Sequence, residues 1–173
     1  MTLKELEESV KKGDYLGALE LQGKDLRKSD LRGGEFAGSD FNTTNLSEAD
    51  LRGANLRGAS FLFGASLQKA RLERANLKNA KLSWADLRES RLEMTNLSKA
   101  DLRGADMNDC GLEEAILEQA FLEEADLRGA NLDRANFYQA NLTNAKIDKD
   151  WKEYISKQNV NGSDGISWIY LMV

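Results

Sequence analysis

The 173-residue sequence contains no histidine and no proline, and its single cysteine is Cys110. Without histidine, the chain has neither a histidine-based catalytic triad nor a histidine metal ligand. One cysteine cannot form an internal disulfide or supply the usual thiolate zinc site, and a lone thiol suits a reducing cytoplasm. Glycine-rich phosphate loops of the GxGxxG or P-loop type are also missing. The sequence therefore predicts neither an enzyme nor a cofactor-binding protein.

Long apolar segments are missing as well. No stretch of the sequence reaches about 18 uninterrupted apolar residues, so no membrane span is expected. The N-terminus is acidic and amphipathic, and it lacks the apolar core of a signal peptide. With 41% hydrophobic and 31% charged residues, the composition is that of a folded protein, most simply one domain. These observations predict a cytoplasmic protein without a membrane segment.

The sequence does contain a sustained five-residue pattern. A large apolar residue occurs at every fifth position from Leu26 to Phe61, and again from Leu67 to Ile147 after one extra residue. A small residue, most often alanine, stands two positions before the large ones. Cys110 takes one of these small positions, so we expect it to be a thiol packed in the core.

A period of five residues matches neither a helix nor a straight strand. Five residues turn a helix by about 500°, and an odd step along a strand moves a side chain to the opposite face. All the large residues can point to one interior only if the chain turns a corner in each unit. Four corners close a square coil of about twenty residues, and such coils stack about 4.8 Å apart. The repeat therefore predicts an all-β solenoid of about six coils, roughly 30 Å long.

The units have the form alanine, then aspartate or asparagine, then leucine and two variable residues. Examples are Ala49-Asp-Leu-Arg-Gly, Ala125-Asp-Leu-Arg-Gly and Ala130-Asn-Leu-Asp-Arg. They closely resemble the pentapeptide repeat family, over about 120 of the 173 residues. The resemblance implies a right-handed quadrilateral β-helix. The chain is similar to the small pentapeptide repeat proteins abundant in cyanobacteria, most of which have no assigned biochemical role.

The pattern divides the chain into three segments. We expect residues 1–25 to form a helical cap and lead-in, residues 26–147 the β-helix, and residues 148–173 a short helix followed by an apolar tail. The extra residue near 62–64 is interpreted as a bulge at a corner, where Gly64 can adopt a positive φ. The alternative is that exposed Leu62 or Phe63 forms a contact point.

Both ends of a stacked coil expose unpaired strand edges, and both ends of this chain have segments suited to cover them. Thr2 and Glu5 form a capping-box pattern that predicts a helix to about Lys12. A second short helix is predicted over residues 148–157, and the last residues are almost wholly apolar. That tail folds over the last coil, forms a homodimer contact, or has no native role. The candidate contact residues of the tail are Trp168, Ile169, Tyr170 and Leu171.

Outward positions twenty residues apart are expected to stack in rows along the rod. One row, in which side-chain amides are expected to hydrogen-bond to one another, holds Asn76, Asn96 and Asn136. Residues 51–103 contain eleven Lys and Arg against five Asp and Glu, whereas residues 104–127 contain eight acids and no base. We name these eight acids the acidic band, a candidate partner-binding site about one turn wide. The acidic band consists of Asp106, Asp109, Glu113, Glu114, Glu118, Glu123, Glu124 and Asp126.

Such a band attracts basic partners and repels nucleic acid, and with a net charge of −5 direct nucleic-acid binding is not expected. The first functional hypothesis is therefore a non-enzymatic protein-interaction or scaffolding module with an unknown protein partner. The resemblance implies an alternative, because some family members imitate duplex DNA, bind DNA gyrase and confer quinolone resistance. The short rod and the basic middle of the sequence argue against this alternative.

Overall fold

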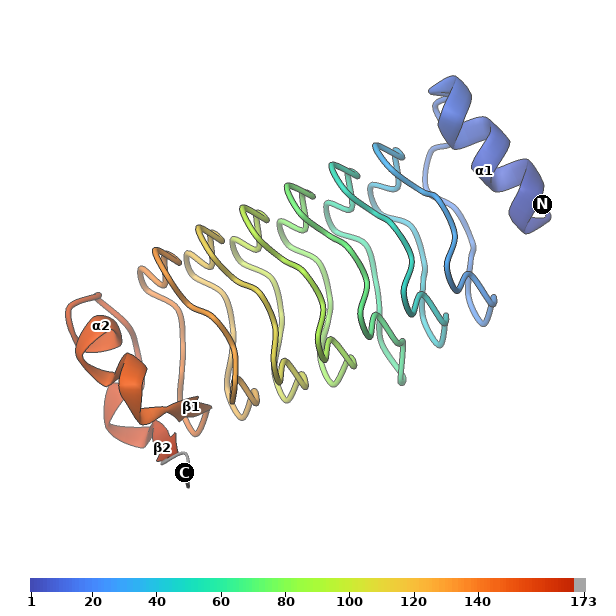
Figure 1. Cartoon of the computed structure of the whole chain (residues 1–173). Coiled ribbons are helices and arrows are strands. Elements are labelled where there is room, and N and C mark those ends of the chain that lie inside the picture. The colour runs from blue at the N-terminus through green and yellow to red at the C-terminus, as the bar shows by residue number, and fades with distance from the viewer. Residues whose placement is uncertain (170–173) are drawn as a thin grey trace.

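The computed structural model describes residues 1–169, which form a rod of stacked coils with α1 at one end and α2 at the other (Figure 1). The fold is a right-handed β-helix solenoid: the repeat predicted the solenoid, and the family resemblance implied its handedness. Parallel β-bridges join residues one coil apart, as they join Asp30 to Asp50 and Asp86 to Asp106. Because the bridged residues are twenty positions apart, each coil holds four five-residue units.

The bridges run along four faces of the rod, one for each unit of a coil, and each face is named here after one of its residues. The Asp86 face is the row Asp25, Asn45, Ser66, Asp86, Asp106, Asp126 and Lys146. The Arg91 face is the row Asp30, Asp50, Arg71, Arg91, Gly111 and Asn131. The Asn96 face is the row Glu35, Asn55, Asn76, Asn96, Ile116 and Asn136. The Asp101 face is the row Glu20, Asp40, Ser60, Lys81, Asp101, Phe121, Asn141 and Asn161.

Each corner of the coil is a β-turn that closes within one unit. In a representative unit, the Ala54 N–H donates to the Leu51 carbonyl at 3.0 Å. The third residue of this turn, Gly53, has a φ of +66°, which is the sign that a type II turn requires. Leu51 and Ala54 are fully buried, whereas the two turn residues between them face solvent. The turn therefore explains why only two residues of each five enter the core.

The interior is a continuous apolar core. From Leu26 to Ile147, every large residue of the repeat is at most 1% exposed. Phe41 and Phe61 stack face to face on successive coils, with ring centroids 4.9 Å apart. Cys110 is buried in this core, so the prediction of a packed thiol is confirmed.

The predicted row of asparagine amides does not form. Ile116 lies between Asn96 and Asn136 on this face and interrupts the row. The Asn96 Oδ1 atom instead accepts from the Ser98 N–H at 3.0 Å, and Asn76 and Asn136 accept the equivalent bond in their own units. The Oδ1 atom of such an asparagine therefore stabilises its own turn, and at Asn136 the Nδ2 atom donates to Glu118 of the preceding coil rather than to another asparagine.

The one-residue insertion lies at a corner of the Asp101 face. Bridges that span it join residues 21 positions apart, as between Asn45 and Ser66. Phe63 and Gly64 have φ angles of +58° and +84°, so the predicted bulge with a positive φ at Gly64 is confirmed. Phe63 is 75% exposed, so the alternative of a contact point also stays open.

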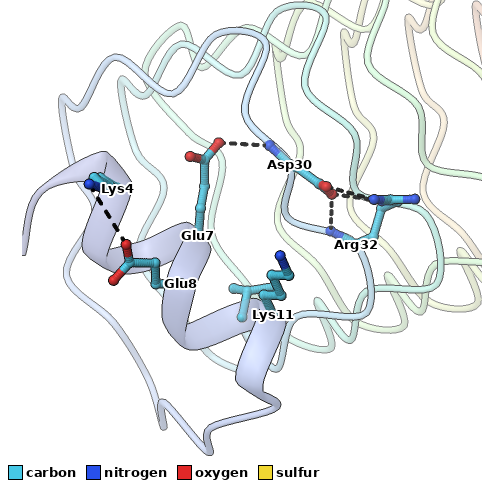
Figure 2. Close-up of a pocket in the computed structure, with 7 residues that line it drawn as sticks. Lys4, Glu7, Glu8, Lys11, Asp30 and Arg32 are labelled. Carbon is cyan, nitrogen blue, oxygen red and sulfur yellow. Dashed lines mark hydrogen bonds and ion pairs between the residues drawn. The ribbon is translucent and has the colours of Figure 1, made fainter.

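Helix α1 (Leu3–Lys12) lies across the N-terminal end of the rod (Figure 1). Thr2 and Glu5 form the predicted capping box, and the apolar face of the helix is buried against the core. Figure 2 shows the hollow between the helix and the coil, where Glu7 Oε1 accepts from the Asp30 N–H at 2.9 Å. A helix side chain thus satisfies a backbone donor at the edge of the coil.

The C-terminal segment forms short elements that pack on the other end. These are β1 (Lys146–Asp148), the 3-10 helix η1 (Lys149–Trp151), α2 (Lys152–Ser156), the 3-10 helix η2 (Ser163–Gly165) and β2 (Ser167–Ile169). β2 pairs in parallel with β1, with Ile147 opposite Trp168. The Tyr154 hydroxyl donates to the Ala135 carbonyl at 2.8 Å, so this segment also satisfies edge groups of the last coil. Among residues 1–169, no helix has the length and apolarity of a membrane span.

The coil ladder extends beyond the predicted limits of residues 26 and 147. At the N-terminal end, Glu20 already bridges Asp40, one unit earlier than the predicted limit. Leu21 continues the five-residue spacing one unit before Leu26, so the pattern itself reaches this unit although Leu19 stands at its small-residue position. Leu19 is only partly buried, since no earlier coil closes that position. At the other end, Asn161 adds a further bridge to Asn141.

Candidate protein-interaction surface

The acidic band surrounds the rod. Because a coil holds twenty residues, the band begins at Asp106 on the Asp86 face and returns to that face at Asp126. Between these two residues, Glu113 lies on the Arg91 face, Glu118 on the Asn96 face and Glu123 on the Asp101 face. The structure therefore distributes the eight acids over all four faces of one turn and does not gather them on one side.

Three acids of the band are ion-paired. Asp106 Oδ2 lies 3.6 Å from Arg88 Nε, and Glu114 Oε1 lies 2.8 Å from Arg134 Nη1. Asp126 is the least exposed of the three, and its Oδ2 lies 2.6 Å from an Arg nitrogen two residues later in the chain. Arg134 and Arg128 compensate Glu114 and Asp126, whereas Arg88 compensates Asp106 only in part because it also pairs with Asp86.

The other five acids of the band form no ion pair among residues 1–169, and we name them the open carboxylates. They are Asp109, Glu113, Glu118, Glu123 and Glu124. Glu118 Oε1 accepts from Asn136 Nδ2 at 2.8 Å, and Glu123 Oε1 accepts from Asn141 Nδ2 at 2.7 Å. Glu113 accepts an equivalent bond from Asn131. A neutral amide orients a carboxylate without cancelling its charge. The open carboxylates, which lie around one turn of the rod, therefore keep their negative charge.

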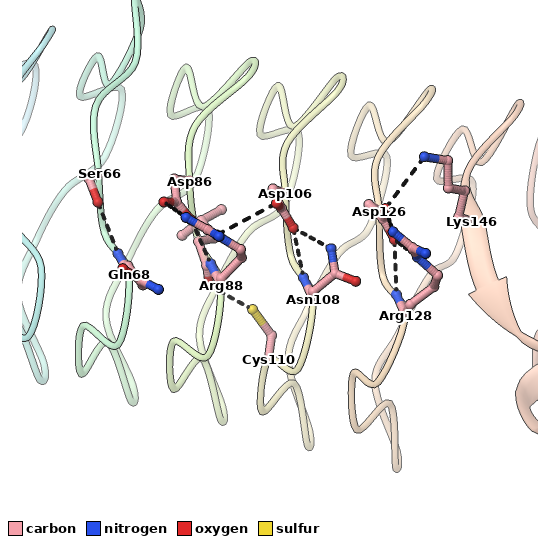
Figure 3. A network of polar contacts seen from close by, with 11 residues as sticks. Ser66, Gln68, Asp86, Arg88, Asp106, Asn108, Cys110, Asp126, Arg128 and Lys146 are labelled. Atoms are coloured by element: carbon pink, nitrogen blue, oxygen red, sulfur yellow. Dashed lines mark hydrogen bonds and ion pairs between the residues drawn. The ribbon is translucent and has the colours of Figure 1, made fainter. Parts of the chain in front are cut away.

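The Asp86 face is, in contrast, largely neutralised along its length (Figure 3). Arg88 donates from Nε and Nη2 to Asp86 at 2.8 and 2.7 Å, a bidentate pair within one unit. These hydrogen bonds lower the pKa of Asp86. Burial raises the pKa of Asp126, but the hydrogen bonds from Arg128 outweigh it and the pKa is lowered. Both aspartates are therefore ionised at neutral pH, and each is hydrogen-bonded to the arginine of its own unit.

A hollow of about 320 Å³ lies on the Asp101 face beside the acidic band, and it is lined by Ser83, Trp84, Arg103, Glu123 and Glu124. Trp84 is 66% exposed although it is the largest side chain of this surface. Its indole ring lies over Gly104 of the next coil, where an added Cβ atom would be 2.5 Å from the ring. Two open carboxylates thus share a hollow with an exposed aromatic ring.

The sequence interpretation missed Trp84. The available signal was an aromatic residue in the last position of its unit, a turn position that faces solvent and holds mostly glycine or polar residues. A second signal was Gly104, twenty residues later, which leaves room for a large side chain on the preceding coil.

A second hollow, of about 580 Å³, lies on the Arg91 face. Its lining includes the five arginines Arg32, Arg52, Arg71, Arg74 and Arg91. Glu73 and Glu93 also line it, and Arg91 Nη2 lies 3.1 Å from Glu73 Oε1. Four of the eleven basic residues of segment 51–103 therefore line this hollow, in the coils that precede the acidic band.

The candidate contact residues of the C-terminal tail are only partly available. Trp168 and Ile169 are half-buried in β2, and the ring centroid of Trp168 lies 5.9 Å from Lys152 Nζ. Tyr170 and Leu171 lie outside the described residues. The described part of the tail folds onto the last coil, where β2 pairs with β1. The homodimer contact stays a prediction.

The described residues include no group of acidic or cysteine side chains arranged to hold a metal ion. Cys110 Sγ donates to the Leu87 carbonyl at 2.9 Å, and burial raises the pKa of this thiol to about 12. The thiol is therefore protonated near neutral pH and is not a nucleophile.

Comparison with known proteins places these observations in context. The sequence matches the family described as pentapeptide repeats in eight copies, over residues 25–61, 62–93, 80–119 and 105–144. No curated protein matches the chain significantly in sequence. The chain is 25% identical to HetL, a pentapeptide repeat protein involved in heterocyst differentiation regulation in the cyanobacterium Nostoc sp. strain PCC 7120. That alignment covers 96% of this chain and 92% of HetL, with a TM-score of 0.53.

Two further solved structures are similar at lower scores. Full-length QnrB1, a plasmid-mediated fluoroquinolone resistance protein, is 21% identical over 87% of this chain and 80% of its own, with a TM-score of 0.43. Rfr23, a pentapeptide repeat protein from the cyanobacterium Cyanothece 51142, is 20% identical over 97% of this chain and 100% of its own, with a TM-score of 0.31.

Proposed function

The chain belongs to the pentapeptide repeat family, and on that premise we propose that it is a non-enzymatic module that binds a basic protein partner through the acidic band. The observation that carries this proposal is the ring of open carboxylates, which forms no ion pair within the described chain. Charge fixed on a rigid rod steers an oppositely charged partner during encounter and sets its orientation.

The chemistry of the surface supports binding rather than catalysis. The chain has no histidine, and its one thiol is buried and protonated. Its carboxylates lie in rows along the faces or around the band and do not converge in a deep cleft. The regulatory involvement of HetL, over nearly the full length of both chains, fits an interaction module of this fold. We propose the same cytoplasmic setting that the sequence predicted.

The alternative of a DNA-imitating gyrase inhibitor stays a prediction, and the charge distribution does not favour it. Imitation of duplex DNA needs acidic charge along the rod, because the phosphates of DNA follow its axis. Here the open carboxylates encircle a single coil, and the five-arginine hollow occupies the coils before it. Inhibition of gyrase supercoiling by the purified protein would revive the alternative.

The proposal is tested by affinity capture from a lysate of the source cell. The open-carboxylate variant replaces Asp109 with Asn and Glu113, Glu118, Glu123 and Glu124 with Gln. We expect the wild type to retain a specific partner of basic surface and the variant to lose it. The reason is that the variant removes the charge of each side chain but keeps its shape and an oxygen that accepts a hydrogen bond.

A matched control removes the same number of charges outside the band. It replaces Asp14, Asp150 and Asp164 with Asn and Glu20 and Glu35 with Gln, five acids that also form no ion pair among residues 1–169. If the control loses the partner as fully as the open-carboxylate variant does, binding depends on net charge alone and the proposal is wrong. Thermal melts of both variants check that the solenoid remains folded.

A further inference from the structure

We propose that the hollow beside Trp84 binds the guanidinium group of an arginine side chain from the partner. This inference rests on the proposed function, because the arginine belongs to the basic partner that the acidic band attracts. It assigns to one face of the band a specific pocket, composed of an aromatic wall and two carboxylates.

The aromatic wall of the pocket is fixed by the solenoid. The backbone N–H of Trp84 donates to the Arg103 carbonyl at 2.9 Å, and the backbone N–H of Gly104 donates to the Glu123 carbonyl at 2.9 Å. These bonds hold the three coils in register. The indole ring lies against Gly104 and leaves its other surface to solvent. An exposed tryptophan on a rigid backbone is a frequent anchor of protein interfaces and the strongest aromatic partner for a cation.

The carboxylate wall of the pocket is not satisfied within the chain. Glu123 Oε1 accepts from Asn141 Nδ2, and Glu123 Oε2 is buried without a hydrogen-bond partner, as are the Oε2 atoms of Glu73, Glu93 and Glu113 elsewhere on the rod. Glu124 occupies the same turn position as Gly104, one coil later. It forms no ion pair among residues 1–169. The unpaired charges of the half-buried Glu123 and the exposed Glu124 attract a cationic ligand with several N–H groups.

Arg103 also lines the pocket, and its charge is already neutralised. Its Nη2 lies 2.6 Å from Asp101 Oδ2, and its Nε donates to Asp101 Oδ1 at 2.8 Å. This bidentate pair holds the guanidinium within its own unit. Once the pair is counted as neutral, Glu123 and Glu124 give the pocket a net negative charge.

The pocket has the size and chemistry for one planar cation. Its volume of about 320 Å³ is at the small end of ligand sites, which suits a single side chain. Guanidinium stacks flat on an indole and donates to carboxylates through a planar fork, whereas the ammonium of lysine does neither. The geometry therefore favours arginine over lysine.

The experiment follows the Trp84 indole N–H by NMR in the ¹⁵N-labelled full chain. The signal is assigned as the one that disappears in Trp84→Phe. The probe is the peptide acetyl-Gly-Ser-Arg-Ser-Gly-amide, and matched peptides carry lysine or uncharged citrulline in place of arginine. We expect a saturable shift with arginine, a smaller one with lysine and none with citrulline. No shift with arginine, or an equal shift with citrulline, overturns the inference.

Two alanine variants separate the aromatic wall from backbone effects. In Gly104→Ala the new Cβ collides with the indole ring and displaces it from the pocket. Gly58→Ala is the matched control, because its φ of +67° is close to the +63° of Gly104 and an added Cβ meets nothing within 4 Å. Both variants carry the same backbone strain. We expect only Gly104→Ala to abolish the shift, and equal loss in both overturns the role of Trp84.

A charge pair tests the carboxylates. The double variant Glu123→Gln and Glu124→Gln is expected to bind the arginine peptide about tenfold more weakly. Glu20→Gln with Glu35→Gln, which removes two charges away from the pocket, is expected to leave its affinity unchanged. Equal weakening by both pairs overturns the pocket. If the arginine peptide does not bind but the open-carboxylate variant still loses its partner, the assignment of the pocket is wrong and the proposed function stands.

Discussion

At the scale of single residues, the surface is organised by the triplet Asp-Leu-Arg. In each triplet the arginine donates two side-chain hydrogen bonds to the aspartate two residues before it, as Arg88 does to Asp86. The six aspartates of these triplets are Asp25, Asp30, Asp50, Asp86, Asp101 and Asp126. Each of the six has a pKa below its usual value. The triplet neutralises acids locally, so the acids outside it determine where the surface charge lies.

These lowered pKa values predict a loss of stability in acid. Hydrogen bonds from Arg27 lower the pKa of Asp25 to about 2, against about 3.9 in the unfolded chain. A group with a lowered folded pKa stabilises the fold above its unfolded pKa, and this contribution disappears as the pH falls through the folded value. We therefore expect the melting temperature to fall between about pH 4 and pH 2. Asp86→Asn should reduce this dependence, and an unchanged melting temperature from neutral pH to pH 2 would contradict it.

Cys110 gives a second prediction at this scale. Its thiol is buried, donates to a backbone carbonyl and has a pKa of about 12 because of desolvation. We expect no reaction with a thiol reagent in the native protein at pH 8 and full reaction in denaturant. Cys110→Ser should fold and retain most of the stability, because Ser90 occupies the same inward position one coil earlier. Rapid labelling of the native thiol would show that this coil opens.

At the scale of elements, the C-terminal segment stabilises the last coil through specific hydrogen bonds. Trp151 Nε1 donates to the Ala130 carbonyl at 3.1 Å, and the Tyr154 hydroxyl donates to the Ala135 carbonyl at 2.8 Å. Both acceptors belong to inward-pointing alanines of the final coil. In earlier coils the equivalent carbonyl accepts from a backbone N–H of the next coil, as Ala85 does from Asp106. The segment thereby takes the place of the next coil at this edge.

Tyr154→Phe tests this arrangement. The variant removes one of the two donors to the Ala135 carbonyl, because Gln158 Nε2 also donates to it at 3.1 Å, and should cost up to about 1 kcal/mol of unfolding free energy. The loss should concentrate in faster hydrogen exchange of the last coil and leave the central coils unchanged. Tyr138→Phe is the matched control, because Tyr138 is exposed and its hydroxyl makes no hydrogen bond among the described residues. Equal effects of the two variants would show that the segment does not stabilise the edge.

Sequence patterns predicted the elements unevenly. The helix from Leu3 to Lys12 follows from its capping box and its apolar face, which are local signals. The pairing of β2 with β1 does not follow from local signals, because an apolar terminal segment fits a folded tail and a dimer contact equally well. The first coil unit lies outside the predicted limits although Leu21 continues the five-residue spacing there.

At the scale of the whole molecule, the register of twenty residues per coil converts sequence position into surface position. The solenoid and the placement of the acidic band in one turn were predictable from that register. The division of the band into paired and open carboxylates was not, because it depends on which side chains meet. Glu114, for example, is paired with Arg134, whereas Glu124 forms no ion pair within the described part of the chain. The Trp84 pocket likewise depends on a glycine one coil later.

The measurement that tests the central claim most directly is the dissociation constant of a fluorescent arginine-rich peptide, read by anisotropy over a series of salt concentrations. The wild type, the open-carboxylate variant and the control lacking five acids outside the band are compared. We expect binding by the wild type that weakens with salt, at least tenfold weaker binding by the open-carboxylate variant, and at most about a twofold change in the control. Equal affinities for all three proteins would contradict the account.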